Sequence, residues 1–376
     1  MRIPLSFPDI EQVEIDVVAG VLRSGRLSMG KKLEEFEARF ADYIGVPYAA
    51  GVSSGTAALH LAIRALAIGA GDEVIVPSFA FVAVANALRY ECVSPVFVDI
   101  DSRTLNLDPR RIEEAVTPRT RGILVVHTFG VPAAMTEIIE IAHRHGLLVI
   151  EDACEALGAE VGGKKAGTFG DVGIFGFYSN KQISTAEGGM AVTQNAEVAA
   201  RIRSLRNHGR SAATRSFEYG EVGYNYRLSE LHCALGVEQL KRVEAILTVR
   251  EKVARGYHRR LGQILSVQLP LQEFSGGRVS WFVYVVRLTE GMVATQREAI
   301  IGKLAERGIE TGRYFAPIHQ QPAYRDLAPP RGSLPITESV AGRTLALPFY
   351  NRITDAQLDT VCEALKESLR KVIGDT

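Results

Sequence analysis

Residues 122–152, GILVVHTFGVPAAMTEIIEIAHRHGLLVIED, decide the fold class. The stretch opens and closes with short apolar runs, and between them apolar residues recur with a helical period from Met135 to His145. Strands buried on both faces have continuous apolar sequences, and parallel strands are joined by crossover helices. The stretch therefore predicts strand, helix and strand of a parallel sheet, with His127 and Asp152 at the carboxyl ends of the two strands.

The same alternation extends to both sides of this stretch. Apolar runs predict further strands over residues 73–77, 95–100, 172–177 and 189–193, and helical periods predict helices over residues 57–66, 81–89 and 109–116. Alternating strands and helices indicate an α/β domain with a mostly parallel central sheet covered on both faces. Ligands of such sheets bind beyond the carboxyl ends of the strands, so we expect the site at that edge.

The pattern changes in the carboxyl-terminal third. A long helical region is predicted over residues 229–261, followed by a strand over residues 281–288 and a helix over residues 295–306. A Pro-rich loop over residues 317–335 and a last helix over residues 354–372 complete the chain. This order predicts a smaller α+β domain. We place the boundary near Val249, which gives a large domain of residues 1–249 and a small domain of residues 250–376. The first 15 or so residues are free to pack on the small domain.

Composition excludes several classes of protein. The 376 residues include 43 Lys and Arg against 43 Asp and Glu, so the basic surface needed for nucleic acid or an anionic membrane is missing. The four cysteines are far apart and form no Cys-x-x-Cys pair, so we expect neither a metal cluster nor a disulfide scaffold. No apolar segment has the length of a membrane span or a signal core, which predicts a soluble, cytoplasmic protein.

Three segments carry residues that could do chemistry. Residues 53–58, SSGTAA, precede the first clear helix, where free backbone amides and the helix dipole favour an anion such as phosphate; an ordinary helix cap is the alternative. Asp152 could pair with a protonated heterocycle nitrogen, or could simply cap the next helix. Lys181 lies among small polar residues and glycines between two apolar runs, where it could form an imine or be an ordinary solvated lysine.

Together these segments supply a phosphate cradle, an acid for a ring nitrogen and an amine for an aldehyde. Pyridoxal phosphate (PLP) needs these three groups from a protein, which orients the cofactor and tunes its electronics. The three segments also follow one another along one edge of the predicted sheet. The residues therefore predict a PLP site.

At these residues the sequence resembles the DegT/DnrJ/EryC1/StrS family of PLP-dependent aminotransferases, which act on nucleotide-linked keto-sugars. The resemblance covers nearly the whole chain and includes seven stretches in order. They are GTAAL at 55–59, VPSFAF at 76–81, HTFGVPA at 127–133, EDACEA at 151–156, NK at 180–181 with EGG at 187–189, GYNYR at 223–227, and RYF at 313–315 with PIH at 317–319. It implies the aspartate-aminotransferase-like architecture (fold type I), a PLP domain with a smaller C-terminal domain.

The resemblance also assigns roles within the site. Lys181 would bond to the cofactor aldehyde and later move a proton, while Asp152 would keep the ring nitrogen protonated. The cofactor-binding set further comprises Gly55, Thr56 and Ala57 at the phosphate, Phe81 on the ring face, Glu155 near the ring hydroxyl, Ser179, and Asn225 reaching the neighbouring subunit. Tyr314 and His319 would lie near the sugar. The residues alone leave Phe81 open as a core side chain and His319 as a loop histidine without a role.

One position departs from the family pattern. Relatives often carry a serine five residues before the lysine, where this sequence has Gly176, so the phosphate contact would pass to Ser179 or to water. The implied function is transfer of an amino group from glutamate or a similar donor to a nucleotide-linked keto-sugar in a homodimer with shared sites. A PLP-dependent sugar dehydratase and a non-catalytic regulator with the same fold remain as alternatives. No metal is expected.

Overall fold

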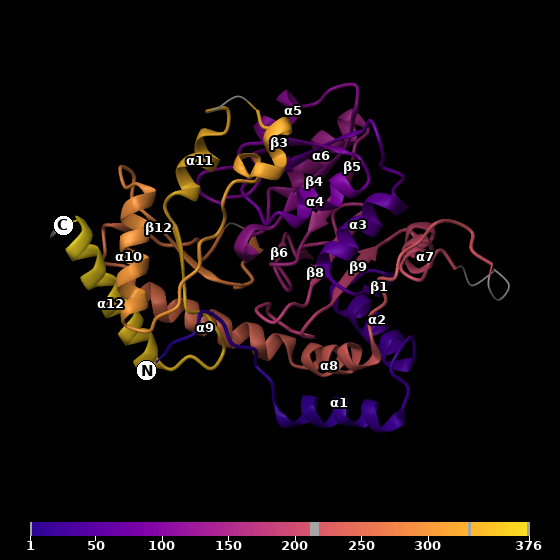
Figure 1. The fold of residues 1–376 in the computed structure, drawn as a ribbon, viewed down its shortest axis with the longest axis horizontal. Coiled ribbons are helices and arrows are strands. Elements are labelled where there is room, and N and C mark those ends of the chain that lie inside the picture. The colour runs from indigo at the N-terminus through magenta and orange to yellow at the C-terminus, as the bar shows by residue number, and fades with distance from the viewer. Residues whose placement is uncertain (1, 211–217, 275, 330–331, 374–376) are drawn as a thin grey trace.

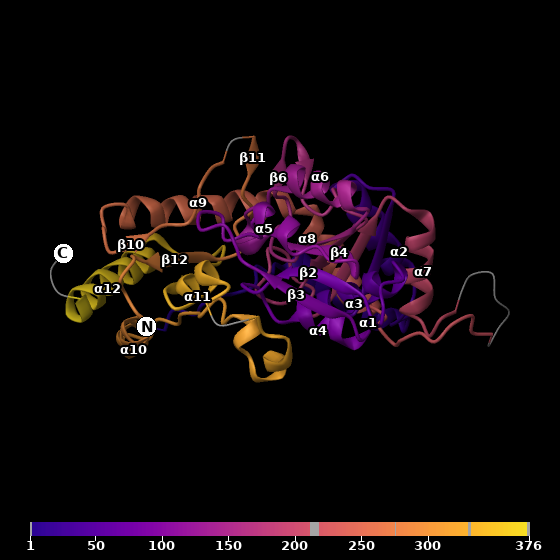
Figure 2. The same cartoon turned by 90° about the horizontal axis from the view of Figure 1, so that it is seen from above.

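The computed structural model describes residues 2–210, 218–274, 276–329 and 332–373. These residues form an elongated molecule in which a large α/β part lies beside a smaller carboxyl-terminal part (Figures 1 and 2). Two consecutive helices, α8 (Glu230–Lys241) and α9 (Val243–Leu261), run along one side and pass from the large part into the small one (Figure 1). The predicted α/β class with a second, smaller domain is thus confirmed.

The large part is built on a seven-stranded sheet with the order β1-β9-β8-β5-β4-β2-β3. All neighbouring pairs among β8, β5, β4, β2 and β3 are parallel, and β9 runs antiparallel to β8 and β1. The strands are β1 (Tyr48–Val52), β2 (Glu73–Pro77), β3 (Ser94–Val98), β4 (Thr120–Val126), β5 (Leu148–Asp152), β8 (Val172–Gly176) and β9 (Gly189–Thr193). The strands predicted for this part therefore exist, with ends shifted by at most a few residues.

Helices cover both faces of this sheet, because alternate strand residues point to opposite sides. Leu124 and Val126 of β4 pack with α3 and α4, whereas Ile123 and Val125 pack with α5 and α6. The other half of that second face packs on α2 and α8. The helices are α2 (Lys31–Ile44), α3 (Gly55–Ala65), α4 (Ala83–Tyr90), α5 (Pro109–Glu114), α6 (Met135–His145), α7 (Ala196–Leu205) and α8 (Glu230–Lys241).

The smaller part has its own core around a three-stranded antiparallel sheet. Its elements are β10 (Val267–Gln268), β12 (Tyr284–Leu288), β13 (Thr344–Leu347), α10 (Ala294–Glu306), α11 (Pro335–Ala341) and α12 (Asp355–Ile373). Residues 317–335, expected to be loop, include two short 3-10 helices, Ile318–Gln320 and Pro322–Leu327. The N-terminal segment packs here too, since Ile3 bridges to Ile309 and belongs to this core.

The helical region expected over residues 229–261 is divided at Arg242 into α8 and α9 (Val243–Leu261). Ile246 and Leu247 of α9 belong to the large core, whereas Tyr257 and Leu261 belong to the small one. Val249 lies between the residues of α9 that pack in the large core and those that pack in the small core. We therefore propose that the two domains divide within α9.

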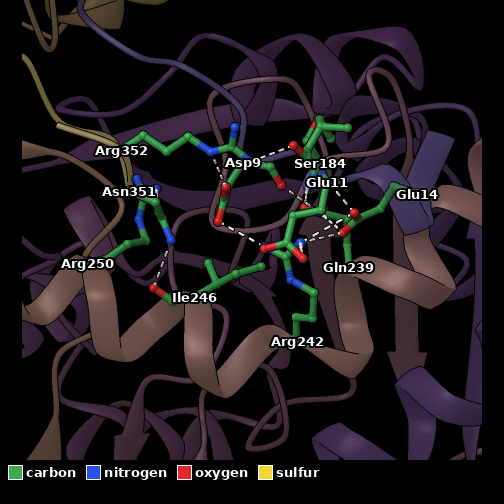
Figure 3. Close-up of polar contacts among 11 residues, drawn as sticks. Asp9, Glu11, Glu14, Ser184, Gln239, Arg242, Ile246, Arg250, Asn351 and Arg352 are labelled. Carbon is green, nitrogen blue, oxygen red and sulfur yellow. Dashed lines mark hydrogen bonds and ion pairs between the residues drawn. The ribbon is translucent and has the colours of Figure 1, made fainter.

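A polar network ties the N-terminal segment to both parts (Figure 3). Glu14 of α1 (Gln12–Ser24) is fully buried, and its carboxylate accepts hydrogen bonds from Gln239 and Arg242. Asp9 accepts from Arg242 at 2.9 Å and from Arg352 of the small part at 2.7 Å. The buried carboxylate is thus paired, as a buried charge requires. In the part of the chain that the structure describes, no helix is both long and apolar enough to cross a bilayer.

Candidate active site

A cavity of about 380 Å³ opens beyond the carboxyl ends of β4, β5 and β8, where the two parts meet. This volume falls within the range of small-molecule sites, which is about 300–1,000 Å³. The large part contributes the start of α3, Phe81, Asp152, Glu155 and the loop around Lys181, and the small part contributes Phe282, Tyr314 and Phe315. The cavity therefore brings together the three segments that the sequence singled out.

The first wall, which we call the cradle wall, is the turn before α3 together with Gly176 and Gly188. Ser54 caps α3, and its Oγ accepts a hydrogen bond from the Ala57 amide at 3.0 Å. This turn can both cap the helix and bind a phosphate. Gly55 and Thr56 line the cavity, and their amides belong to the first helical turn, where no intrahelical acceptor is available. Ala57 itself is buried and its amide is already satisfied.

Glycines keep this wall close to the backbone. A Cβ atom on Gly189 would lie 2.3 Å from the carbonyl oxygen of Ser54, and one on Gly55 would lie 2.9 Å from the Sγ of Cys154. A Cβ on Gly176 would lie 3.2 Å from the same sulfur. The thiol of Cys154, which the sequence did not single out, thus fills the space beside Gly176.

Asp152 ends β5 and faces the cavity. One of its oxygens accepts a hydrogen bond from the Cys154 amide at 3.0 Å, which fixes the carboxylate. The neighbouring Glu151 points to the other side of the sheet, where it accepts backbone hydrogen bonds from Gly167, Phe169 and Gly170.

His127 directly follows β4 and does not line the cavity. Its ring is fully buried, with Nε2 3.0 Å from the carboxylate of Glu151, and Nδ1 accepts a hydrogen bond from the Ala133 amide. Of the two residues predicted at strand ends, Asp152 therefore faces the cavity, whereas His127 is buried behind it.

Lys181 follows β8 in a turn that returns to β9. Its side chain is 16% exposed, so it is not a solvated surface lysine. Its Nζ lies 3.8 Å from Oε1 of Glu155 and 4.0 Å from the centre of the Phe282 ring. Glu155 is buried and accepts a hydrogen bond from the Phe129 amide, and burial raises the pKa of its carboxyl.

Aromatic side chains form the remaining surface of the cavity. Phe81 precedes α4 and is 62% exposed, so it is not a core side chain. Tyr314 and Phe315 come from the small part, and burial raises the pKa of the Tyr314 phenol. The Asn180 side chain opposes this rise in the pKa of Tyr314, while its own Oδ1 is buried without a partner in the described part of the chain. A buried acceptor without a partner is costly and indicates a ligand donor at this point.

Four expected site residues lie outside the cavity lining, and they are Ala57, Ser179, Asn225 and His319. Ser179 is half-buried, and Asn225 is exposed. His319 is buried, with its Nδ1 2.7 Å from Oγ of Ser78 and its Nε2 3.4 Å from the carboxylate of Glu338. In this position it contacts Ser78, the residue after β2, and Glu338 of α11, so its expected place near the sugar stays a prediction.

These groups fit PLP. The cradle amides suit the phosphate, Asp152 suits the ring nitrogen, the exposed face of Phe81 suits the ring, and Lys181 can reach an aldehyde. Phe282 also belongs to the site, although no signal in the sequence marked it, because it is remote from Lys181 along the chain.

Comparison with known proteins agrees with this geometry. The chain is 42% identical to GDP-perosamine synthase of Caulobacter vibrioides, covering 98% of each chain, and 35% identical to the Escherichia coli O157:H7 protein of that name, covering 97% and 98%. The crystal structure of the aminotransferase TlmJ from Streptoalloteichus hindustanus superposes with a TM-score of 0.92 at 32% identity, covering 98% and 99%. The sequence profile of the DegT/DnrJ/EryC1/StrS aminotransferase family matches residues 8–366. The chain therefore belongs to the DegT/DnrJ/EryC1/StrS aminotransferase family, and it is a PLP-dependent aminotransferase.

Proposed function

We propose that this aminotransferase moves an amino group from glutamate, or a similar amino acid, to the keto group of a nucleotide-linked deoxysugar. The observation that carries the proposal is the position of Lys181, whose amine lies inside a cavity that also holds an anion cradle and Asp152. Two relatives that match nearly the whole chain are named GDP-perosamine synthase. A GDP-linked keto-sugar is therefore the acceptor to test first.

The protein's own groups divide the work. PLP, when bound, takes up the amino group from the donor and passes it to the acceptor. Gly55 and Thr56 would hold its phosphate, and Asp152 would keep its ring nitrogen charged. Lys181 would hold its aldehyde through the side-chain amine and, once released, would carry the proton that amino transfer moves. The aromatic side chains Phe282, Tyr314 and Phe315 exclude water from this step.

We further propose that two copies of the chain complete each other's sites. Among the described residues that line the cavity, Lys181 is the one cation, whereas Asp152, Glu155 and Glu187 carry carboxylates. A phosphate with nearly two negative charges needs more donors than this set provides. Asn225, which lies exposed between two anchored tyrosines, is the residue that we expect a second copy to supply.

The anchors of Asn225 support this proposal. Tyr224 donates a hydrogen bond to Glu91 at 2.9 Å, and the Tyr226 hydroxyl lies 3.1 Å from Nδ1 of His60. The two rings stack with centroids 5.1 Å apart. Tyr224 and Tyr226 both point into their own chain. Because side chains alternate in direction along an extended segment, Asn225 between them points outward.

The test combines the protein, PLP, L-glutamate and a GDP-linked 4-keto-6-deoxysugar, and follows the sugar by mass spectrometry. Replacement of the ketone by an amine, with formation of 2-oxoglutarate, is the expected result, and Lys181→Ala is the control that gives none. Loss of water from the sugar without amination would favour the dehydratase. No change with any nucleotide-linked keto-sugar would contradict the proposal.

A further inference from the structure

Arg250 of α9 is a buried arginine whose partners are neutral. Its residue is 4% exposed, and no carboxylate lies within ion-pair distance of it in the described part of the chain. Nε donates to the carbonyl of Trp281 at 2.6 Å, Nη2 to that of Phe282 at 2.7 Å and Nη1 to Oδ1 of Asn351 at 3.0 Å. Figure 3 shows Arg250 beside Asn351 and Ile246. Burial lowers the pKa of its guanidinium to about 10, which leaves it charged at neutral pH.

Burying a guanidinium is costly, so its contacts point to what it does. Trp281 and Phe282 lie directly before β12, which begins at Tyr284, so their carbonyls are not part of the sheet. The guanidinium satisfies both carbonyls from one rigid fork, which a lysine cannot do. The chain can therefore leave the sheet here and turn toward the cavity, although the sequence predicted a continuous strand from residue 281.

The preceding residue, Ser280, fixes the other end of this turn. Its amide donates to the carbonyl of Gly130 at 2.9 Å, and its Oγ accepts a hydrogen bond from Gln182 at 3.0 Å. Gln182 is the residue after Lys181 and also donates to the carbonyl of Glu155. The segment that carries Phe282 is thus held between Arg250 on one side and the Lys181 loop on the other.

Phe282 is the residue of this segment that contacts the reacting lysine. Its ring centre lies 4.0 Å from Nζ of Lys181, within the range of a cation–π contact. The other close contact of the amine is the carboxylate of Glu155 at 3.8 Å. When the Lys181 amine is not bonded to the cofactor, one ring face and one carboxylate therefore hold it over the cavity.

We propose that Arg250 is a positioning residue for Lys181. By holding the carbonyls of Trp281 and Phe282, it keeps the Phe282 ring against the lysine amine and so sets the place to which the amine returns in each catalytic cycle. The proposal rests on the proposed function, because that function makes Lys181 the reacting amine.

The test measures Lys181 in the protein without cofactor. Apoprotein is treated with an N-hydroxysuccinimide ester of acetic acid at one neutral pH, and peptide mass spectrometry follows acetylation of Lys181 relative to the exposed Lys31. Phe282→Leu keeps the apolar bulk but loses the ring face that lies 4.0 Å from the amine, so the ratio should rise by about two- to fivefold as the amine is released from this contact. Phe282→Tyr retains the ring and is the matched control.

Arg250→Lys should change the ratio in the same direction by about twofold, because one ammonium cannot hold all three acceptors. The double variant should not exceed Phe282→Leu alone, since both changes act through one ring. If Arg250→Lys does not fold, Asn351→Ala, which removes one acceptor of the guanidinium, takes its place and should act in the same direction. A folded protein with an unchanged ratio, or effects that multiply in the double variant, would overturn the proposal.

Failure of this proposal and of the proposed function can be told apart. A changed ratio in a protein that transfers no amino group would leave the positioning by Arg250 intact and remove its catalytic purpose. Normal amino transfer with an unchanged ratio would leave the function intact and remove the role of Arg250.

Discussion

The two walls of the cavity are built in different ways. The cradle wall consists of backbone and glycine from segments adjacent in the sheet, and a single added carbon atom at Gly189 would strike the Ser54 carbonyl. The aromatic wall consists of Phe282, Tyr314 and Phe315 from the small part, and polar groups far away in the sequence hold it. The cradle wall therefore tolerates no added atoms, whereas the aromatic wall depends on the hydrogen bonds that hold its backbone. Mutations in the two walls should therefore have different effects.

The largest effect is expected where both walls meet, at Lys181. Lys181→Ala removes the amine that bonds to the cofactor, so amino transfer should fall by at least about a thousandfold. The thermal unfolding of the apoprotein should change little. Turnover with each donor and acceptor checks the first point, and scanning calorimetry checks the second. Retained turnover would remove Lys181 from the chemistry.

The cradle wall is tested next by Gly189→Ala. Its Cβ would lie 2.3 Å from the Ser54 carbonyl oxygen and 2.7 Å from the Gly55 amide nitrogen, and neither backbone atom can move freely. We expect a loss of about 1–3 kcal/mol in the free energy of unfolding and weaker binding of PLP. Denaturant unfolding and a PLP titration measure the two effects.

Gly69→Ala is the matched control for that variant, because nothing lies within 4 Å of the added atom. It should leave both quantities unchanged. Equal behaviour of the two alanine variants would show that the cradle wall does not depend on space.

A milder test of the cradle wall uses Gly176→Ser, which introduces the serine that the family resemblance leads us to expect five residues before Lys181. The added Cβ would lie 3.2 Å from Sγ of Cys154, so the single variant should lose about 1 kcal/mol of stability. Cys154→Ala removes the obstacle, and the double variant should regain this loss and bind PLP more tightly through the new hydroxyl. A double-mutant cycle on unfolding free energy measures the coupling. Additive effects would mean that the two positions do not compete for space.

The smallest expected effect concerns Glu155, which lies under the aromatic wall. Burial raises the pKa of its carboxyl above the ordinary value of 4.5, so the folded state binds its proton more tightly than the unfolded state. The stability that this proton contributes is full below pH 4.5 and is lost as pH rises through the folded pKa. Glu155→Gln has no proton to lose, so its stability does not fall in this way. The melting temperature of the variant minus that of the wild type should therefore increase as pH rises, by about 1–3 °C at neutral pH. A difference that is constant with pH would contradict the account.

The contrast between the walls also explains what the sequence could predict. Six of the seven strands of the central sheet, all except β1, and the residues Gly55, Asp152 and Lys181 were predicted, because local apolar periods and short contiguous motifs mark them. No local pattern marked Phe282 or Arg250, because they act through contacts between segments distant in the chain.

The N-terminal helices illustrate the same limit. Sequence reasoning assigned no element before residue 50, yet α1 and α2 are regular helices. Their support is long-range as well: buried Glu14 pairs with Arg242, and Glu230 accepts hydrogen bonds from the start of α2. Such pairing leaves no period in the sequence, but the apolar side chains of α2 do. Leu33, Phe36, Phe40 and Ile44 recur at helical spacing, so α2 was predictable from the sequence.

The most direct test of the central claim is the visible absorbance of the protein with PLP, before and after L-glutamate, in wild type and in Lys181→Ala. The account predicts a band in the wild type that depends on the covalent bond to Lys181, bleaches with the amino donor and is absent from the variant. No band after added PLP, or the same spectrum in both proteins, would contradict it.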